Sequence, residues 1–313
     1  MAATDAMRRV RGAARRRPGL IALGAIVAVA AGTTTYFAPQ RAQLTSSCGY
    51  GYGYGTCPPP ASGYWLLTSD GGVFNFDATW YGSPKAAGTV GGVALTGLSA
   101  GPGGVGYVIS RANGGVFNFG TTFYGSEAGK LPAGVRAVGI ATDPATGGYW
   151  VLASDGGVFN FHAPWFGSPK AAGTVGGVAV TGIAAAPNGN GYVISRANGG
   201  VFNFGTTFYG SEAGKLPAGV SGVGIATDPS TGGYWLLTSN GGVFNFGAPW
   251  YGSPKAADTV GGVALTGIAA GPGGNGYLIS RANGGVFNFG VPFHGSEAGK
   301  LPAGVTGVGI ATN

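Results

Sequence analysis

Short apolar runs alternate with glycine-rich polar stretches through residues 63–313, and this alternation recurs about every 42 residues. In the second recurrence, residues 107–110, 116–119, 123–124 and 138–141 have the composition of short strands. No stretch has the period of a helix. A tyrosine marks each recurrence, at a spacing that alternates between 43 and 42 residues: Tyr64, Tyr107, Tyr149, Tyr192, Tyr234 and Tyr277. The pattern therefore predicts six tandem copies of one all-β unit with four strands.

A tight turn follows the first predicted strand of every copy. Asn113-Gly114 separates residues 107–110 from residues 116–119, and this dipeptide between two strands is a strong hairpin signal. The equivalent positions hold Asp70-Gly71, Asp155-Gly156, Asn198-Gly199, Asn240-Gly241 and Asn283-Gly284. Within residues 116–119, alternation places the two phenylalanines on one face and the valine and asparagine on the other. Each copy is therefore predicted to contain a β-hairpin.

The phase of the repeat predicts how the copies join. The first copy begins at Tyr64 with no V-x-x-G-I-A strand before it, whereas the last copy ends on that strand at residues 305–312. Pairing of these two segments would complete six blades, and an open stack would leave unpaired sheet edges. We therefore predict a six-bladed β-propeller of four-stranded blades, closed by pairing of the C-terminal strand with the first blade. A β-solenoid or a different ring is the alternative.

The repeat motif resembles that of a known group of proteins. Residues 63–76 read GYWLLTSDGGVFNF, and TWYGS follows at residues 79–83. These residues resemble the GYW/DGG/FG repeats of exported actinobacterial proteins, where the repeats occur alone or beside cell-wall-directed enzyme domains. The resemblance covers about four-fifths of the chain. It implies a propeller-like fold and a surface location, and it brings no known catalytic residues to transfer.

The N-terminal residues differ from the repeats in charge and composition. Residues 1–18 form a basic head with six arginines, and residues 19–38 are uncharged and mainly aliphatic. A basic head before an apolar segment is typical of export, either as a cleaved signal peptide or as one hydrophobic helix that anchors the chain in a membrane. Both outcomes stay open, and both predict that the repeats lie outside the cytoplasm.

Residues 39–62 form a predicted linker that contains both cysteines of the chain. Cys48 and Cys57 flank a Gly-Tyr run, and three prolines follow. In an exported chain, a pair this close most simply forms a disulfide, with lipid modification of Cys48 as the less favoured alternative.

The charge of the repeat region argues against a nucleic-acid partner. The chain has a net charge of +7, but residues 63–313 carry ten basic and nine acidic residues. A nucleic-acid-binding domain concentrates positive charge on its folded surface. We therefore predict no nucleic-acid partner.

Two sets of residues are candidate ligand-binding groups. Trp80, Trp165 and Trp250 precede an aromatic residue near the predicted outer edge of the blade, where exposed rings can stack on sugars. Packing is the favoured interpretation of these tryptophans. Arg111, Arg196 and Arg281 form a threefold set that could bind a carboxylate or phosphate. The favoured interpretation is that each arginine binds a carbonyl or an acid within its own blade. The other tryptophans, Trp65, Trp150 and Trp235, are predicted to pack between blades.

The remaining polar residues favour structural roles. Asp70 and Asp155 lie at hairpin turns, and Asp143 and Asp228 precede proline in a second turn. Glutamates lie three residues before lysines on predicted loops: Glu127 and Lys130, Glu212 and Lys215, and Glu297 and Lys300. The two histidines, His162 and His294, are more than three copies apart. We therefore predict no catalytic residue, no metal site and no cofactor.

These observations together predict an exported, secreted or cell-surface β-propeller. Its predicted role is a non-catalytic binding or adhesion module for envelope glycan or protein. One alternative is a propeller hydrolase or lyase that acts on polysaccharide, and another is a display scaffold without a specific ligand. An uncleaved N-terminal helix would add the membrane as a partner.

Overall fold

The computed structural model describes residues 63–313, which form six antiparallel sheets of three strands each. The predicted N-terminal helix at residues 19–38 and the predicted Cys48–Cys57 disulfide lie outside the described residues. Apart from strands, the described part of the chain has two short 3-10 turns, Pro102–Gly104 (η1) and Pro272–Gly274 (η2).

Each sheet has an inner, a middle and an outer strand. The inner strands are Leu95–Ala100 (β3), Ala137–Thr142 (β6), Val180–Ala185 (β9), Gly222–Thr227 (β12), Leu265–Ala270 (β15) and Gly307–Thr312 (β18). The middle strands are Tyr64–Thr68 (β1), Tyr107–Arg111 (β4), Tyr149–Ala153 (β7), Tyr192–Arg196 (β10), Tyr234–Thr238 (β13) and Tyr277–Arg281 (β16). The outer strands are Val73–Phe76 (β2), Val116–Phe119 (β5), Val158–Phe161 (β8), Val201–Phe204 (β11), Val243–Phe246 (β14) and Val286–Phe289 (β17).

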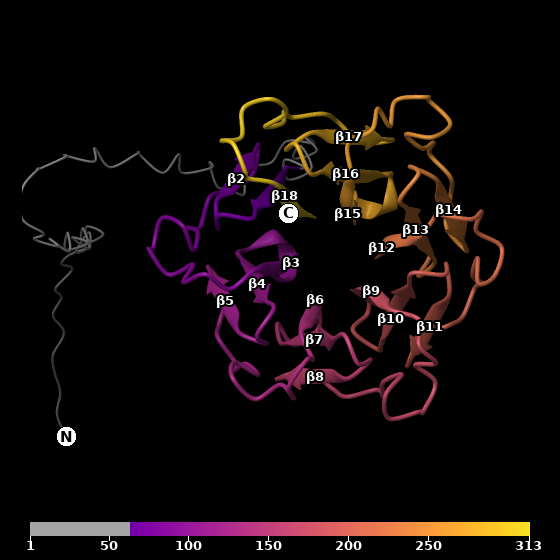
Figure 1. Ribbon diagram of the computed structural model, residues 1–313, viewed down its shortest axis with the longest axis horizontal. Helices are drawn as coiled ribbons and strands as arrows, with labels where there is room; N and C mark the ends of the chain where they lie inside the picture. The colour runs from indigo at the N-terminus through magenta and orange to yellow at the C-terminus, as the bar shows by residue number, and fades with distance from the viewer. Residues whose placement is uncertain (1–62) are drawn as a thin grey trace, which may run out of the picture. The chain divides into compact units, whose positions relative to one another are not determined.

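The six sheets surround a common axis in a propeller-like arrangement (Figure 1). Neighbouring inner strands contact each other in the order β3, β6, β9, β12, β15 and β18, and β18 also contacts β3. Strand β18 pairs antiparallel with β1, with Ile310 opposite Leu66. The two ends of the described chain therefore belong to one sheet.

The predicted hairpins connect the middle and outer strands of each sheet. In the first sheet, the backbone N–H of Thr68 donates to the carbonyl of Gly72 over 2.9 Å, and Asp70 Oδ1 accepts from the Gly72 N–H over 3.1 Å. Gly71 has a φ of +82°, and a Cβ at this position would lie 2.5 Å from the Val90 side chain. The Asp-Gly and Asn-Gly dipeptides therefore supply both the polar cap and the conformation that the turn requires.

Each sheet has three strands, where the sequence predicts four. The predicted third strand, at residues 123–124, has no regular secondary structure and pairs with no other strand. Instead, the Tyr149 hydroxyl accepts from the N–H of Tyr124 over 3.1 Å and donates to the carbonyl of Gly125 over 2.7 Å. One buried side chain therefore satisfies one backbone N–H and one backbone carbonyl of this segment, in place of bonds to a partner strand.

The sheets associate in pairs through buried tryptophans, as the sequence predicts for Trp65 and its equivalents. Trp65 packs in one buried cluster with Leu98 and Tyr107 of the following sheet, and its ring centroid lies 5.2 Å from that of Tyr107. Trp150 and Trp235 make the same contact with Tyr192 and Tyr277. The intervening seams have smaller clusters without tryptophan. This alternation gives the six sheets a pseudo-threefold symmetry of double units.

Candidate functional site

One exposed aromatic side chain follows the outer strand in every copy of the repeat. These six residues, here called the rim aromatics, are Trp80, Phe123, Trp165, Phe208, Trp250 and Phe293. Each has 50–53% of its surface exposed. The three tryptophans were candidates from sequence, and their exposure disagrees with the favoured packing interpretation. Sequence reasoning missed the three phenylalanines because it assigned their segments to a strand, although they occupy the same position of the repeat.

The backbone on both sides of Trp80 is fixed by buried neighbours. The indole N–H of Trp65 donates to the carbonyl of Thr79 over 2.8 Å. The Tyr81 ring packs against the rings of Trp65 and Tyr107, with centroids 6.2 and 5.9 Å away. The preceding and following residues are therefore anchored, while Trp80 itself is half exposed.

The same anchoring recurs at the other two tryptophans of the rim. The indole N–H of Trp150 donates to the carbonyl of Pro164 over 2.7 Å, and that of Trp235 donates to the carbonyl of Pro249 over 2.7 Å. The tryptophan-bearing copies thus use one buried indole to position one exposed indole.

Six buried tyrosine hydroxyls fix the segments just beyond the rim aromatics. Each hydroxyl donates to the carbonyl of a glycine two residues after a rim aromatic: Tyr64 to Gly295, Tyr107 to Gly82, Tyr149 to Gly125, Tyr192 to Gly167, Tyr234 to Gly210 and Tyr277 to Gly252. Burial raises the pKa of Tyr107, Tyr192 and Tyr277 to about 12, although the backbone hydrogen bonds lower it in part. These tyrosines are therefore neutral hydrogen-bond donors at physiological pH.

The three candidate arginines are engaged within their own part of the sheet. One guanidinium nitrogen of Arg111 donates to the carbonyl of Val90 over 2.7 Å, and the guanidinium carbon lies 4.8 Å from the centroid of the Phe117 ring. Arg196 and Arg281 make equivalent contacts. The Nε atom of each arginine is buried without a hydrogen-bond partner in the described residues. None of the three lines a cavity on the axis, so the structure does not bring them together there.

The carboxylates bind neighbouring groups rather than one another. Asp70 and Asp155 pair with Lys85 and Lys170 over 2.5 and 2.6 Å, a partner that sequence reasoning missed. Asp143 and Asp228 are fully buried and accept hydrogen bonds from residues of their own turns, such as the Thr146 hydroxyl at 2.7 Å. Two of the predicted loop pairs are loose ion pairs, Lys215 with Glu212 and Lys300 with Glu297, each at 3.9 Å.

The two histidines lie at equivalent contacts between neighbouring sheets. His162 belongs to the sheet on one side of its contact, and His294 occupies the position on the other side of its own. His162 stacks on Tyr124, with ring centroids 4.3 Å apart. At the seam between the two ends of the described chain, His294 replaces the tyrosine and Asp77 replaces the histidine, with Nδ1 and Oδ2 3.5 Å apart. Sequence reasoning treated these histidines as isolated because their partners come from a neighbouring copy.

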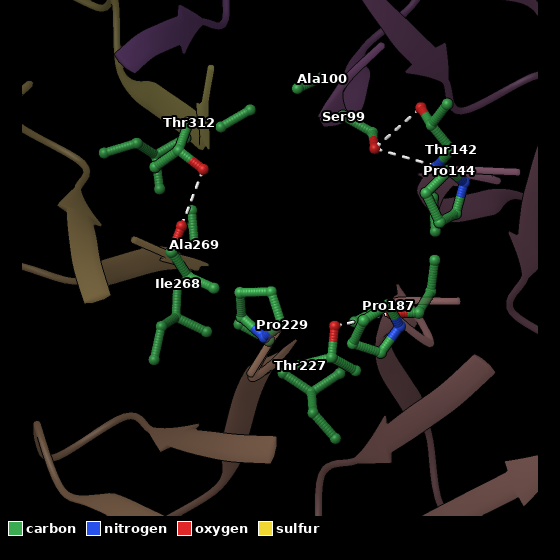
Figure 2. A pocket seen from close by; sticks show the side chains of 18 of the residues that line it. Ser99, Ala100, Thr142, Pro144, Pro187, Thr227, Pro229, Ile268, Ala269 and Thr312 are labelled. Atoms are coloured by element: carbon green, nitrogen blue, oxygen red, sulfur yellow. Dashed lines mark hydrogen bonds between the residues drawn. The ribbon is translucent and has the colours of Figure 1, made fainter. Parts of the chain in front are cut away.

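Two cavities lie along the central axis. The larger one, here called the funnel, has a volume of about 410 Å³, and the smaller one has a volume of about 100 Å³. Figure 2 shows threonines and prolines around the opening of the funnel. Six aliphatic side chains line both cavities and therefore form the layer between them: Leu98, Ile140, Ile183, Ile225, Ile268 and Ile310.

Within residues 63–313, no three His, Cys, Asp or Glu side chains come close enough to hold a metal ion. No helix in the same residues is long and apolar enough to cross a membrane. The apolar segment at residues 19–38, predicted to be a signal peptide or a membrane anchor, lies outside the described residues.

The sequence matches no family model, and it matches no curated protein. Among solved structures, it is similar to the β-propeller domain of Myceliophteria thermophila Cps50 (Swd1), with 14% identity and a TM-score of 0.40 over 64% of this chain and 71% of that chain. It is also similar to a chain in the crystal structure of a nidogen/laminin complex, with 10% identity and a TM-score of 0.49 over 80% of this chain and 98% of that chain.

Proposed function

We propose that residues 63–313 are a non-catalytic binding module that holds envelope glycan against the rim aromatics. The observation that carries this proposal is the exposure of one aromatic ring at the same position of all six copies. Indole and phenyl rings offer a broad apolar face, which can stack on the apolar face of a sugar. Six equivalent rings favour a ligand whose own chemistry repeats, because several weak contacts then act together.

Anchoring of the rim supports the same function. Thr79 and Tyr81 are fixed on either side of Trp80 by buried residues, so the backbone that carries the indole is already ordered before a ligand stacks on it. Preorganised rings of this kind retain more of their contact energy as affinity. Exposure alone would be weaker support, since single exposed apolar residues are common on protein surfaces.

The proposed setting is extracytoplasmic. The basic residues 1–18 and the apolar residues 19–38 are typical of an exported chain, and the repeat motif resembles exported actinobacterial repeats. We propose that the module is secreted or anchored at the membrane, with its ring of six sheets closed between the two ends of the repeat region.

The test is cosedimentation of the purified repeat region with insoluble cell-wall polysaccharide. The decisive variant combines Trp80→Ala, Trp165→Ala and Trp250→Ala. If each ring contributes roughly 0.5–1.5 kcal/mol, loss of all three weakens apparent binding at least about tenfold. The thermal transition is measured in parallel and should move little, because the three indoles are about half exposed.

A matched variant combines Phe123→Ala, Phe208→Ala and Phe293→Ala, which removes the smaller rings from the alternate copies. It should weaken binding less than the tryptophan variant, and the two sets combined should abolish binding. Binding that survives removal of all six rings in a folded protein would refute the role of the rim. A wild-type protein that sediments no more with polysaccharide than without it would refute glycan binding altogether.

The non-catalytic part of the proposal has its own test. Polysaccharide incubated with the wild-type protein should release no new reducing ends and no unsaturated products. Release of either, if lost on mutation of a described carboxylate, would establish the hydrolase or lyase alternative.

A further inference from the structure

The funnel has the volume of a small-molecule site. Its volume of about 410 Å³ falls within the range of about 300–1,000 Å³ that is typical of such sites. The layer of six aliphatic side chains lies at its inner end, and threonines and prolines surround its opening (Figure 2). The cavity is distinct from the rim aromatics, none of which lines it.

The lining of the funnel favours an uncharged ligand. No Asp, Glu, Lys, Arg or His is among the lining residues, which are mainly isoleucine, alanine, proline and threonine. A charged group that entered this cavity would lose hydration without gaining a partner of opposite charge. A neutral, largely apolar molecule would instead gain from burial of its surface.

The threonines at the opening already have hydrogen-bond acceptors. The Thr227 hydroxyl donates to the carbonyl of Ala185, and the Thr312 hydroxyl donates to the carbonyl of Ala270, both over 2.7 Å. Each bond joins two neighbouring inner strands, as Figure 2 shows. These two hydroxyl protons are therefore committed to holding the sheets together.

The third position of this set is different because of Ser99. Thr142 donates to the Ser99 oxygen through both its hydroxyl and its backbone N–H, each over 3.0 Å. At the other two positions of the pseudo-threefold set, the residues equivalent to Ser99 are Ala184 and Ala269. Ser99 thus accepts two bonds, and in the described part of the chain its own hydroxyl proton has no acceptor. Ser99 therefore departs from the alanines at the equivalent positions by adding a hydroxyl donor to the lining of the funnel.

We propose that the funnel binds one neutral, largely apolar small molecule that presents a hydrogen-bond acceptor, such as a ketone or ester oxygen, to the Ser99 hydroxyl. Aliphatic contacts with the inner layer would supply most of the affinity. The single donor would fix the orientation of the ligand, as polar groups in apolar pockets commonly do.

The probe for this test is prodan, a neutral naphthalene ketone with one strong acceptor and polarity-dependent fluorescence. Titration of the repeat region should show saturable binding of one prodan molecule per chain, with emission shifted to the blue. Ser99→Ala should weaken this binding about threefold to tenfold, which corresponds to one net hydrogen bond. The variant residue already occupies the two equivalent positions, so folding should be unaffected.

Two controls separate the hydrogen bond from general apolar binding. A naphthalene hydrocarbon without an acceptor should compete with prodan, and its own dissociation constant from that competition should be the same for the wild-type protein and for Ser99→Ala. Ala100→Phe, which narrows the opening of the funnel, should weaken both ligands. If that variant does not fold, the comparison of the two ligands on Ser99→Ala alone remains decisive.

The outcomes discriminate clearly between sites. Absence of saturable prodan binding, or equal prodan affinity in the wild-type protein and Ser99→Ala, would overturn the proposal. Binding that is lost with the six rim aromatics but unchanged by Ser99→Ala would assign the probe to the rim instead.

Discussion

Two sets of aromatic residues recur in all six copies and have opposite environments. The tyrosines that begin the middle strands have no exposed surface, and each of their hydroxyls binds a glycine carbonyl beside the preceding rim segment. The rim aromatics lie only two residues before those glycines and are half exposed. The same class of side chain therefore builds the ring in one position and faces solvent in the other.

The comparison teaches that the position of each exposed rim aromatic depends on buried aromatic side chains that bind its neighbouring residues. Trp65 and Trp80 belong to the same copy, and the buried indole binds the residue just before the exposed one. The two tryptophans have the same hydropathy. Their burial differs because the following sheet supplies a surface for Trp65 to pack against.

The largest expected effect comes from removal of a buried tryptophan. Trp150→Ala should lower the free energy of unfolding by about 3–5 kcal/mol, because it leaves a cavity between two sheets and a carbonyl at Pro164 without its donor. Trp165→Ala, fifteen residues later, should cost about 1 kcal/mol or less. Urea denaturation monitored by circular dichroism measures both. Similar losses of unfolding free energy in the two variants would contradict the division between buried and exposed tryptophans.

A smaller effect is expected when a tyrosine loses only its hydroxyl. Tyr192→Phe keeps the ring in its cluster but leaves the carbonyl of Gly167 without its donor. The cost should be about 1–3 kcal/mol of unfolding free energy. It should also loosen the neighbouring rim segment, seen as faster hydrogen exchange at residues 165–168. A loss of stability without local exchange would show that the hydroxyl does not hold the rim.

The same hydroxyls predict a decline in stability at high pH. Burial raises the pKa of Tyr107, Tyr192 and Tyr277 to about 12, whereas the pKa in the unfolded chain is about 10. Because the folded value is the higher one, the stabilisation is complete below about pH 10 and is lost as the pH rises towards 12. Urea midpoints measured from pH 8 to 12 should fall over this window. The urea midpoint of Tyr192→Phe should fall less steeply with pH than that of the wild-type protein. Parallel curves for the two proteins would contradict the assignment of the pH dependence to these tyrosines.

Part of this arrangement could be predicted from sequence because it depends on local residues. The period gives the six all-β units, the Asp-Gly and Asn-Gly dipeptides give the hairpins, and the Trp65 set packs between sheets as predicted. The number of strands in each sheet could not be predicted, since the bond from Tyr149 that replaces a fourth strand joins residues of different copies.

The candidate site was less accessible from sequence than the fold. Phe123 and its equivalents resemble strand residues, and only the tertiary structure shows that their side chains face solvent. The carbonyl contacts of Arg111 agree with the favoured interpretation of the arginines. Ser99 could have been noticed as the only serine among aligned alanines, but its free donor depends on how Thr142 bonds to it.

The smallest expected effect lies outside both aromatic sets, at the ion pair between Asp70 and Lys85. Partial burial raises the pKa of Asp70, but the Lys85 ammonium and the Thr68 hydroxyl outweigh it and hold the pKa below its usual value. The depressed value means that the stabilisation is present near neutral pH and is lost as the pH falls below about 4. Lys85 is more than half exposed, so the pair should contribute less than about 1 kcal/mol.

Asp70→Asn has a natural control, because the equivalent residue of the fifth copy is Asn240. The Asn240 oxygen accepts from the N–H of Gly242 over 3.2 Å, as the Asp70 oxygen does from Gly72, so the turn should survive the substitution. Urea midpoints should differ slightly between Asp70→Asn and the wild-type protein at pH 7, and the difference should shrink as the pH falls below about 4. A difference that does not shrink with falling pH would mean that Asp70 stabilises the hairpin through its shape and hydrogen bonds rather than through its charge.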